Sequence, residues 1–307
     1  MKNTKTKNLY PPARRIDVVL DTDTFNEIDD QFAISYMLAL KERINPVAIY
    51  AAPFYNFRVS SPAEGMNKSF DEIMKLLKLA DREDLMPSVF KGSDRYLPDE
   101  STAVISPAAK DLAERAMNYS AENPLYVVAI GAVTNIASAI ILRPEIAEKT
   151  VIVWLGGHAR HLPDTKEFNM IQDIAASRVV MASDASFVQL PCNGVVSEFR
   201  ISGPELCWLK NSNPLADYLA QNCLDEVARY AESSVWTRVI WDVTAIGWLV
   251  NDGERFMKQQ TGETYLPDYN GIYEKNPISK KSAYVYCIER DGLMRDMIRK
   301  LIGNDDF

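Results

Sequence analysis

The sequence predicts an α/β protein whose open, mostly parallel, Rossmann-like sheet is flanked by helices. The main observation is that short apolar runs alternate with helical patterns from residue 16 to residue 191. This alternation favours a parallel sheet with helices on both faces. The 307 residues are 47% hydrophobic and 25% charged, which is an ordinary globular composition and enough for a large core. With no clear linker or internal repeat, we expect one domain over residues 1–307.

Strand and helix signals define the predicted elements in order. A polar arm over residues 1–15 comes first. The expected strands are Ile16–Leu20, Pro46–Ala52, Ser88–Phe90, Leu125–Ile130, Val151–Leu155, Phe187–Leu190 and Tyr284–Ile288. The expected helices carry apolar residues every three or four positions. They are Gln31–Lys41, Ala63–Ala80, Pro107–Tyr119, Ile136–Leu142, Glu145–Lys149, Ile174–Ala182, Pro204–Lys210, Pro214–Tyr230, Val243–Val250 and Leu293–Ile302.

Two local features complete this prediction. Thr134 and Asn135 precede a helical pattern, so we expect them to cap that helix. Residues 250–282 contain several glycines and prolines, which predicts an irregular excursion from the sheet.

Composition excludes several classes of protein. The net charge is -8 and no long basic stretch is present, which argues against a nucleic-acid partner. No apolar run approaches the length of a membrane span, and the polar N-terminus is not a secretory signal. The four cysteines are widely spaced, so neither a zinc site nor a disulfide scaffold is expected. We therefore expect a cytoplasmic protein with no membrane partner.

Four aspartates within ten positions form the strongest candidate site. Asp21 and Asp23 share one face at the end of the first strand, and Asp29 and Asp30 open the next helix. Open α/β sheets bind ligands at this position, beyond the carboxyl ends of strands. Clustered carboxylates repel one another unless a hard cation such as Ca²⁺ or Mg²⁺ lies among them. The alternative is that Asp29 and Asp30 only cap the helix.

Further polar and aromatic residues follow the later strands. Carboxylates and amides at these positions suit a polyhydroxylated ligand, because each can bond to neighbouring hydroxyls. A carboxylate flanked by apolar residues, such as Asp242, is costly to bury without a functional partner. The candidates are Asn56, His158, His161, Glu167, Asn169, Trp236, Trp241 and Asp242, with the two tryptophans as a possible stacking wall for a base.

The motifs together resemble the inosine–uridine-preferring nucleoside hydrolase family. The matching segments occur in the family's order over roughly residues 16–250. They are Asp21-Thr22-Asp23 with Asp29-Asp30, the segment Val128–Asn135, Leu155-Gly156-Gly157, Glu167-Phe168-Asn169, and Asp242.

This resemblance implies a calcium-dependent hydrolase that cleaves ribonucleosides to ribose and free base. It implies a Ca²⁺ held by the side chains of Asp23, Asp30 and Asp242 and by the carbonyl of Ile130. Asp23 would also deprotonate the attacking water. The implied ribose ligands are Asp29, Asn56, Glu167 and Asn169. The partner would be a small-molecule nucleoside, and the family's habit is a homodimer or homotetramer.

Three departures from the family pattern leave the nucleobase preference open. The segment Thr24–Ile28 is two residues longer than usual, which brings Asn26 or Glu27 towards the pocket. Trp241 stands where many members have a histidine that protonates the leaving base. The sugar-binding asparagine after Gly-Gly has no clear match, and His161 lies nearest.

Two rival functions remain at this point. One is a nucleoside- or ribose-binding protein with weak or no turnover, because Trp241 replaces the acid. The other is a haloacid-dehalogenase-type phosphatase, because residues 18–24 fit an apolar strand followed by DxDxT with Asp21 as the nucleophile.

Overall fold

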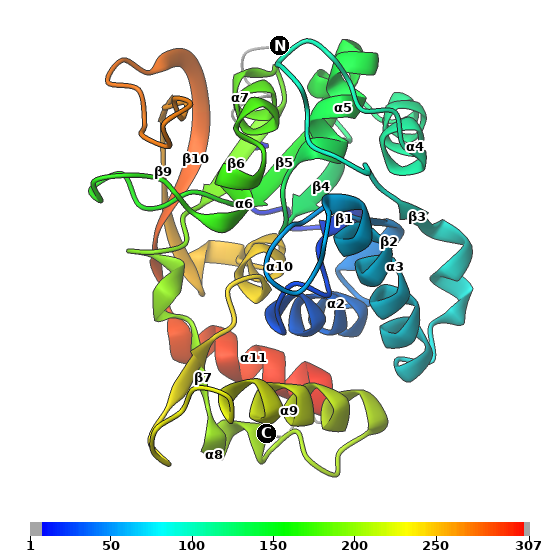
Figure 1. Ribbon diagram of the computed structural model, residues 1–307, viewed down its shortest axis with the longest axis vertical. Coiled ribbons are helices and arrows are strands. Elements are labelled where there is room, and N and C mark those ends of the chain that lie inside the picture. Colours follow the sequence, from blue (N-terminus) through cyan, green and yellow to red (C-terminus); the bar gives the residue numbers. More distant parts are fainter. Residues whose placement is uncertain (1–7, 304–307) are drawn as a thin grey trace.

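The computed structural model describes residues 8–303 and contains an eight-stranded sheet between two layers of helices (Figure 1). Its strands are β1 Ile16–Thr22, β2 Ile44–Ala51, β3 Val89–Lys91, β4 Leu125–Ala129, β5 Thr150–Leu155, β6 Ser186–Leu190, β9 Met257–Thr264 and β10 Ile278–Ile288. Their order is β3-β2-β1-β4-β5-β6-β10-β9. Every neighbouring pair is parallel except β9 with β10. The predicted fold class is confirmed.

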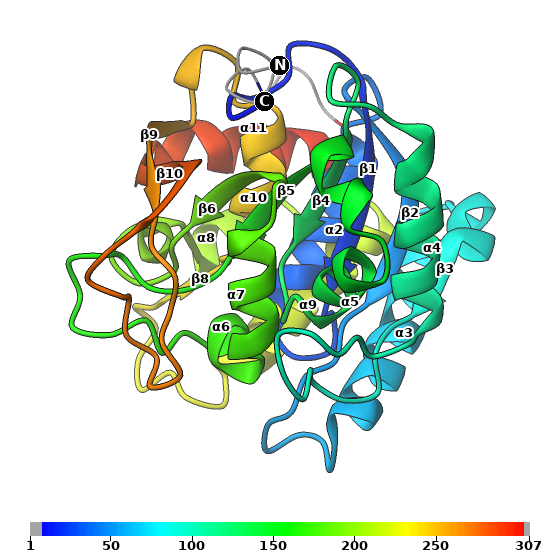
Figure 2. The same cartoon turned by 90° about the horizontal axis from the view of Figure 1, so that it is seen from above.

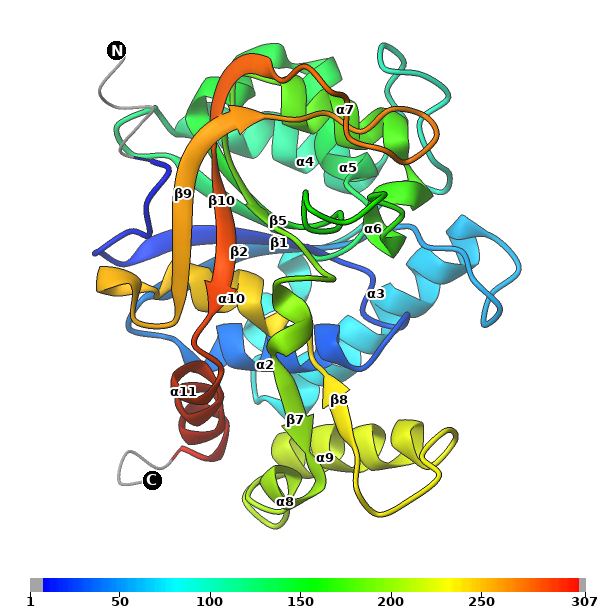
Figure 3. The same cartoon turned by 90° about the vertical axis from the view of Figure 1, so that its left-hand side faces the viewer.

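Helices cover both faces of this sheet (Figure 3). One hydrophobic core includes α2 Asp29–Ala39, α3 Pro62–Leu79, α9 Pro214–Val227, α10 Val243–Leu249 and α11 Arg290–Ile302. The other includes α4 Pro107–Arg115, α5 Thr134–Leu142 and α7 Ile174–Ala182. A view from above shows α4, α5 and α7 on the same side of the sheet (Figure 2). Within the described part of the chain, no helix combines the length and apolarity needed to cross a membrane.

Strand β1 shows why the central runs are continuously apolar. Val18 and Leu20 join one core and Val19 joins the other, and all three are fully buried. Successive side chains of a strand point to opposite faces. A central parallel strand covered on both faces therefore needs apolar residues at consecutive positions.

The segment after residue 200 adds elements that the sequence did not predict. A small antiparallel sheet pairs β7 Arg200–Ser202 with β8 Thr237–Val239, and the predicted helix that follows β7 is α8 Gly203–Leu206. Figure 3 shows β7, β8, α8 and α9 together in a lobe at one side of the main sheet. Each of these strands has three residues, which is too short for a periodic signal.

The prediction of an irregular excursion over residues 250–282 is wrong for much of that segment. It contains β9, which pairs antiparallel with β10 at the edge of the sheet. The sequence of β9, Met-Lys-Gln-Gln-Thr-Gly-Glu-Thr, has little apolar alternation, because most of its side chains are partly or fully exposed. Edge strands are often polar, since only one edge is paired and exposed apolar edges promote aggregation.

Smaller corrections concern helix ends and the N-terminal arm. Glu145–Lys149 belongs to a 3-10 helix, α4 ends at Arg115, and α8 is shorter than predicted. Thr134 and Asn135 do not cap α5, because its N-cap residue is Val133 and no side chain caps it. In the described part of the arm, Leu9 is buried against the core, and residues 1–7 lie outside the described residues.

Candidate active site

A pocket of about 490 Å³ lies at the carboxyl ends of the central strands. Asp23 follows β1, Ile130 follows β4 and Asn193 follows β6, and all three line it. The strand order reverses between β1 and β4, and open α/β sheets bind ligands at such a switch point. The volume lies within the range of roughly 300–1,000 Å³ that is typical of small-molecule sites.

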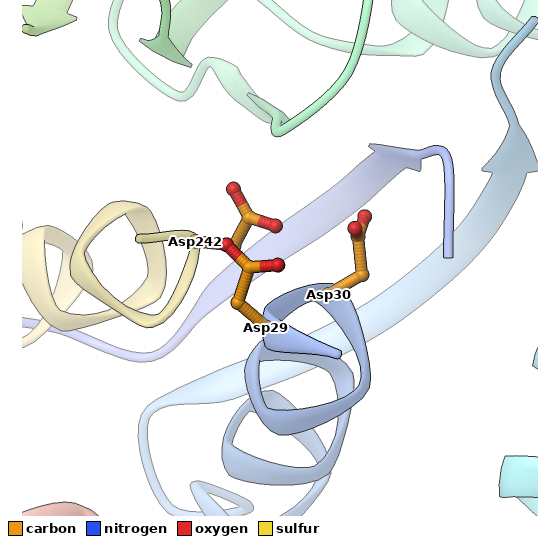
Figure 4. A group of neighbouring side chains, drawn as sticks. All are labelled: Asp29, Asp30 and Asp242. Carbon is orange, nitrogen blue, oxygen red and sulfur yellow. The ribbon is translucent and has the colours of Figure 1, made fainter. Parts of the chain in front are cut away.

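Three aspartates at the starts of two separate helices meet at the floor of this pocket. Asp29 and Asp30 occupy the first turn of α2, and Asp242 immediately precedes α10. One carboxylate oxygen of each lies within 4.8 Å of the others. Figure 4 shows the side chains of Asp29 and Asp242 facing each other, with Asp30 beside them. Residues more than 200 positions apart are thus brought together because α2 packs against α10.

Asp29 and Asp30 do not serve as caps of α2. The N-cap residue of α2 is Ile28, and no side chain caps the helix. The alternative that Asp29 and Asp30 only cap the helix is therefore wrong. The positive end of the helix dipole still favours their negative charge.

Burial and mutual repulsion raise the pKa of the floor carboxylates. Burial raises the pKa of Asp23, Asp29 and Asp242 well above the ordinary value, and repulsion from neighbouring carboxylates raises it further. Burial also raises the pKa of Asp30 to about 7, although hydrogen bonds with Thr22 and Asp242 oppose the shift. Repulsion among buried carboxylates is the expected cost of bringing them together.

The donor set fits a hard divalent cation. Oδ2 of Asp23 and Oδ1 of Asp29 are buried and have no hydrogen-bond partner. Buried polar atoms are normally bonded, and these two oxygens in the pocket lining are available to coordinate a cation. Ca²⁺ prefers six to eight oxygen ligands, largely from carboxylates and carbonyls. Asp23 lines the pocket with Asp29, Asp30 and Asp242, although it lies outside the tight group of three.

The carbonyl of Ile130 lies at the junction of β4 with the pocket. The backbone of Ile130 is anchored by a 2.9 Å hydrogen bond from its N–H to the carbonyl oxygen of Asp21. The side-chain amide of Asn169 donates to the carbonyl oxygens of Ile130, at 3.2 Å, and Leu155, at 3.1 Å. A carbonyl oxygen has two lone pairs, so that of Ile130 keeps one for a further ligand.

Glu167 lines the pocket but is already engaged in structural bonds. Its carboxylate accepts hydrogen bonds from the backbone N–H groups of Gly157, Asn169 and Met170. The thiol of Cys192 also bonds to it. Glu167 is the N-cap residue of α6, Phe168–Gln172. These bonds fix the loop between β5 and α6 at the pocket wall.

Two asparagines and a glutamate come from the loops that follow β1 and β2. The amide of Asn56 donates to Oδ1 of Asn26 at 2.7 Å, which ties the two loops together. Glu27, in the longer loop, forms an ion pair with Arg238 of β8. Asn26, Glu27 and Asn56 all line the pocket.

Not every predicted residue lies at the pocket. Trp241 lines it, whereas His161 is exposed and is not part of the lining. Trp236 packs near Gly203, at the start of α8, and does not line the pocket. Asp21 is fully buried, accepts a 2.8 Å hydrogen bond from Asn135 and lies outside the lining. A phosphatase nucleophile must reach its substrate, so the position of Asp21 contradicts the phosphatase alternative.

Sequence reasoning missed several lining residues. They are Phe57, Lys166, Phe168, Cys192 and Asn193, and His158 was left as an ambiguous candidate. Cys192 and Asn193 follow the predicted strand Phe187–Leu190, so the rule that ligands lie beyond strand ends could have found them. Phe57 gave no such signal, because exposed aromatic residues in loops are common.

The fold and pocket together describe an α/β enzyme with a carboxylate-rich site for a small molecule. A family profile described as inosine-uridine preferring nucleoside hydrolase matches residues 18–286, so the chain belongs to that family. It is homologous to ribonucleoside hydrolases, which are N-glycosyl hydrolases. A sequence search of curated proteins gave no match.

Solved structures with the same fold are distant in sequence. A plant nucleoside hydrolase has a TM-score of 0.74 at 18% identity, with 94% of this chain and 99% of that chain covered. A purine-preferring ribonucleoside hydrolase from Gardnerella vaginalis gives 0.72 at 19%, covering 94% and 98%. An inosine-guanosine nucleoside hydrolase gives 0.73 at 16%, covering 94% and 99%. At these identities the likeness establishes the fold.

Proposed function

We propose that this protein hydrolyses the N-glycosidic bond of ribonucleosides to ribose and free base, with Ca²⁺ as its cofactor. The observation that carries the proposal is the pocket floor. Four buried aspartates, from the loop after β1, from α2 and from the start of α10, converge there, and two of their oxygens have no partner. Membership of the nucleoside hydrolase family supports the same activity.

In this proposal the cation is held by Asp23, Asp30, Asp242 and the carbonyl of Ile130. Asp29 lies close enough to Asp30 and Asp242 to orient a hydroxyl beside the cation. When bound, Ca²⁺ supplies a positive centre that attracts hydroxyl and water oxygens and keeps the neighbouring carboxylates ionised.

The chain's own residues then carry out the remaining tasks. Asp23 in its ionised form takes the proton of the attacking water, which is worth on the order of a hundred-fold or more in rate. Asp29, Asn56 and Asn169 bind the hydroxyls of the ribose. Cleavage of a glycosidic bond passes through a sugar with oxocarbenium character, and the surrounding carboxylates favour that positive charge.

The residue at position 241 bears on activation of the leaving base. Trp241 lines the pocket beside Asp242 and supplies an aromatic surface rather than an acid. The tryptophan at position 241 has no acidic group that could protonate a base. This favours the second candidate function, a nucleoside-binding protein with little turnover.

A screen of purine and pyrimidine ribonucleosides tests the proposal. Release of reducing sugar is followed with added calcium and again with excess chelator. We expect hydrolysis of at least one nucleoside and its loss with chelator. Calcium-dependent nucleoside binding without sugar release would favour the binding protein. Sugar release that persists in chelator would contradict the cofactor assignment.

A further inference from the structure

The pocket residues lie in a linear order that the sheet imposes. Neighbouring parallel strands lie about 4.8 Å apart, so residues at successive strand ends are displaced stepwise along the sheet edge. From β2 to β6 the pocket is lined by Phe57, Asp23, Ile130, Leu155 and Asn193. The pocket therefore has an end beside β2 and an end beside β6, with the acidic floor between them.

The central part of the pocket is suited to the sugar. Asp23 follows β1 and Ile130 follows β4, and the amide of Asn169 bridges the ends of β4 and β5. Carboxylates and amides pair with vicinal hydroxyls, whereas neither end of the pocket has a comparable group of acids. A ribose over this centre must direct its base to one end and its 5′ carbon to the other.

The β2 end presents an exposed aromatic ring on an anchored loop. Phe57 lines the pocket although its side chain is 92% exposed. Its loop is held on both sides, by the bond between Asn56 and Asn26 and by two hydrogen bonds from Arg58 to the carboxylate of Glu226 in α9. The guanidinium of Arg58 lies 5.6 Å from the centroid of the Phe57 ring. An exposed ring on an anchored loop offers a stacking surface at little entropic cost.

The β6 end presents polar groups instead. His158, Lys166 and Asn193 line it, and the amide nitrogen of Asn193 lies 3.5 Å from Nε2 of His158. The backbone of His158 is fixed, because its N–H donates to Thr165 and its carbonyl accepts from Tyr273. These donors suit an oxygen substituent rather than a planar apolar ring.

We propose that the nucleoside binds with its base stacked on Phe57 at the β2 end and its 5′ oxygen directed to Asn193 at the β6 end. Phe57 is then a specificity-determining residue of the nucleoside hydrolase site. This inference rests on the proposed function, because it assigns an orientation to the substrate proposed there.

The test compares the affinity for a whole nucleoside with that for ribose alone. Stacking of a base on an aromatic side chain is worth about 1–3 kcal/mol, which corresponds to roughly 5- to 150-fold in affinity. We expect Phe57→Ala to raise the KM for the best nucleoside by about ten-fold and to leave inhibition by ribose unchanged. Phe57→Tyr should restore the KM. Tyr55→Ala is the matched control, since Tyr55 is an exposed aromatic of the same loop outside the pocket lining.

A second comparison tests the direction of binding. In Asn193→Ala the preference for a nucleoside over its 5′-deoxy analogue should fall, whereas in Phe57→Ala it should persist. Loss of this preference in Phe57→Ala alone would overturn the orientation. An unchanged KM in Phe57→Ala would also overturn the proposed orientation. If the oligomeric state of Phe57→Ala changes while its KM does not, Phe57 belongs to a subunit interface and the orientation is again contradicted.

Failure of the proposed function is recognised separately. If the wild-type protein releases no ribose from any nucleoside, the hydrolase assignment fails. The orientation is then tested by calorimetric binding of nucleoside and ribose to the same variants. A wild-type enzyme that hydrolyses nucleosides but shows no effect of these substitutions would contradict the orientation alone.

Discussion

In the part of the chain that the structure describes, acidic side chains at the rim of the pocket form ion pairs, whereas those at its floor do not. The rim is defined by two ion pairs of the loops that follow β1 and β2: Glu27 pairs with Arg238, and Arg58 pairs with Glu226 of α9. At the floor, within residues 8–303, the acids form no ion pair with lysine or arginine. These floor acids are Asp23, Asp29, Asp30 and Asp242. The more exposed acids therefore have cationic partners within the chain, and the most deeply buried ones do not.

This difference separates structural charges from functional ones. An exposed ion pair contributes little, about 0–1 kcal/mol, and serves mainly to position loops. Buried carboxylates without a cationic partner are costly, so a protein that retains four of them side by side is arranged for a ligand that compensates their charge. The contrast predicts large effects from changes at the floor and small effects from changes at the rim.

Substitution of Asp23 should have the largest effect on activity. Asp23→Asn keeps the size of the side chain but removes the base that accepts the proton of water. We expect kcat to fall by at least about a hundred-fold. Steady-state hydrolysis of the best nucleoside measures the change, and circular dichroism confirms that the variant is folded. Activity that survives intact would show that the base is another residue.

The metal-free protein should lose stability as the pH rises. Burial raises the pKa of Asp30 to about 7 from a reference value of 3.8. The folded state therefore binds more protons than the unfolded state, so this contribution is complete below about pH 4 and is lost as the pH approaches 7. A shift of this size corresponds to about 4 kcal/mol for a single group.

Thermal unfolding in excess chelator at pH 6 and pH 8 measures this dependence. We expect a lower Tm at pH 8. Added calcium should raise the Tm more at pH 8 than at pH 6, because the cation competes with protons for the same carboxylates. A Tm that rises with pH in the presence of chelator would contradict the raised pKa values of the floor acids.

Trp241 should affect substrate affinity more than structure. If its ring stacks on the base, Trp241→Ala raises the KM for nucleosides by roughly ten-fold, as expected for the loss of one aromatic surface. The KM and the Tm are measured together, because Trp241 is also partly buried against the core. An unchanged affinity for every nucleoside would reject the stacking role.

The smallest effect is expected at the rim. Glu27→Gln removes one partner of the ion pair with Arg238, in which the side chain of Glu27 is 41% exposed. We expect a change in the free energy of unfolding of no more than about 1 kcal/mol, measured by urea denaturation. A loss of activity comparable to that of a floor variant would show that Glu27 acts in the reaction.

The floor could be predicted from the sequence because most of its acids are close together in the chain. Asp23, Asp29 and Asp30 lie within eight positions, after a continuous apolar strand. The central strands were predictable for the same reason, since full burial on both faces demands apolar runs. Asp242 was found through its apolar neighbours and the family resemblance, since its contact with Asp29 depends on the packing of α10 against α2.

The rim and the sheet edge could not be predicted as well, because their residues obey no short-range pattern. Arg238 and the loop of Phe57 are placed by tertiary ion pairs, that of Arg238 with Glu27 and that of Arg58 with Glu226. Strand β9 is polar because it lies at an edge, so it lacks the alternation by which strands are recognised. Asp21, by contrast, was expected among the converging acids, but its side chain bonds to Asn135 away from the pocket.

Calcium binding by calorimetry tests the central claim most directly, with chelator-treated wild-type protein compared with Asp242→Asn and Glu27→Gln. We predict one ion bound per chain in the wild type, loss of that binding in Asp242→Asn, and little change in Glu27→Gln. The absence of binding in the wild type, or equal binding in Asp242→Asn, would contradict the account of the floor as a cation site.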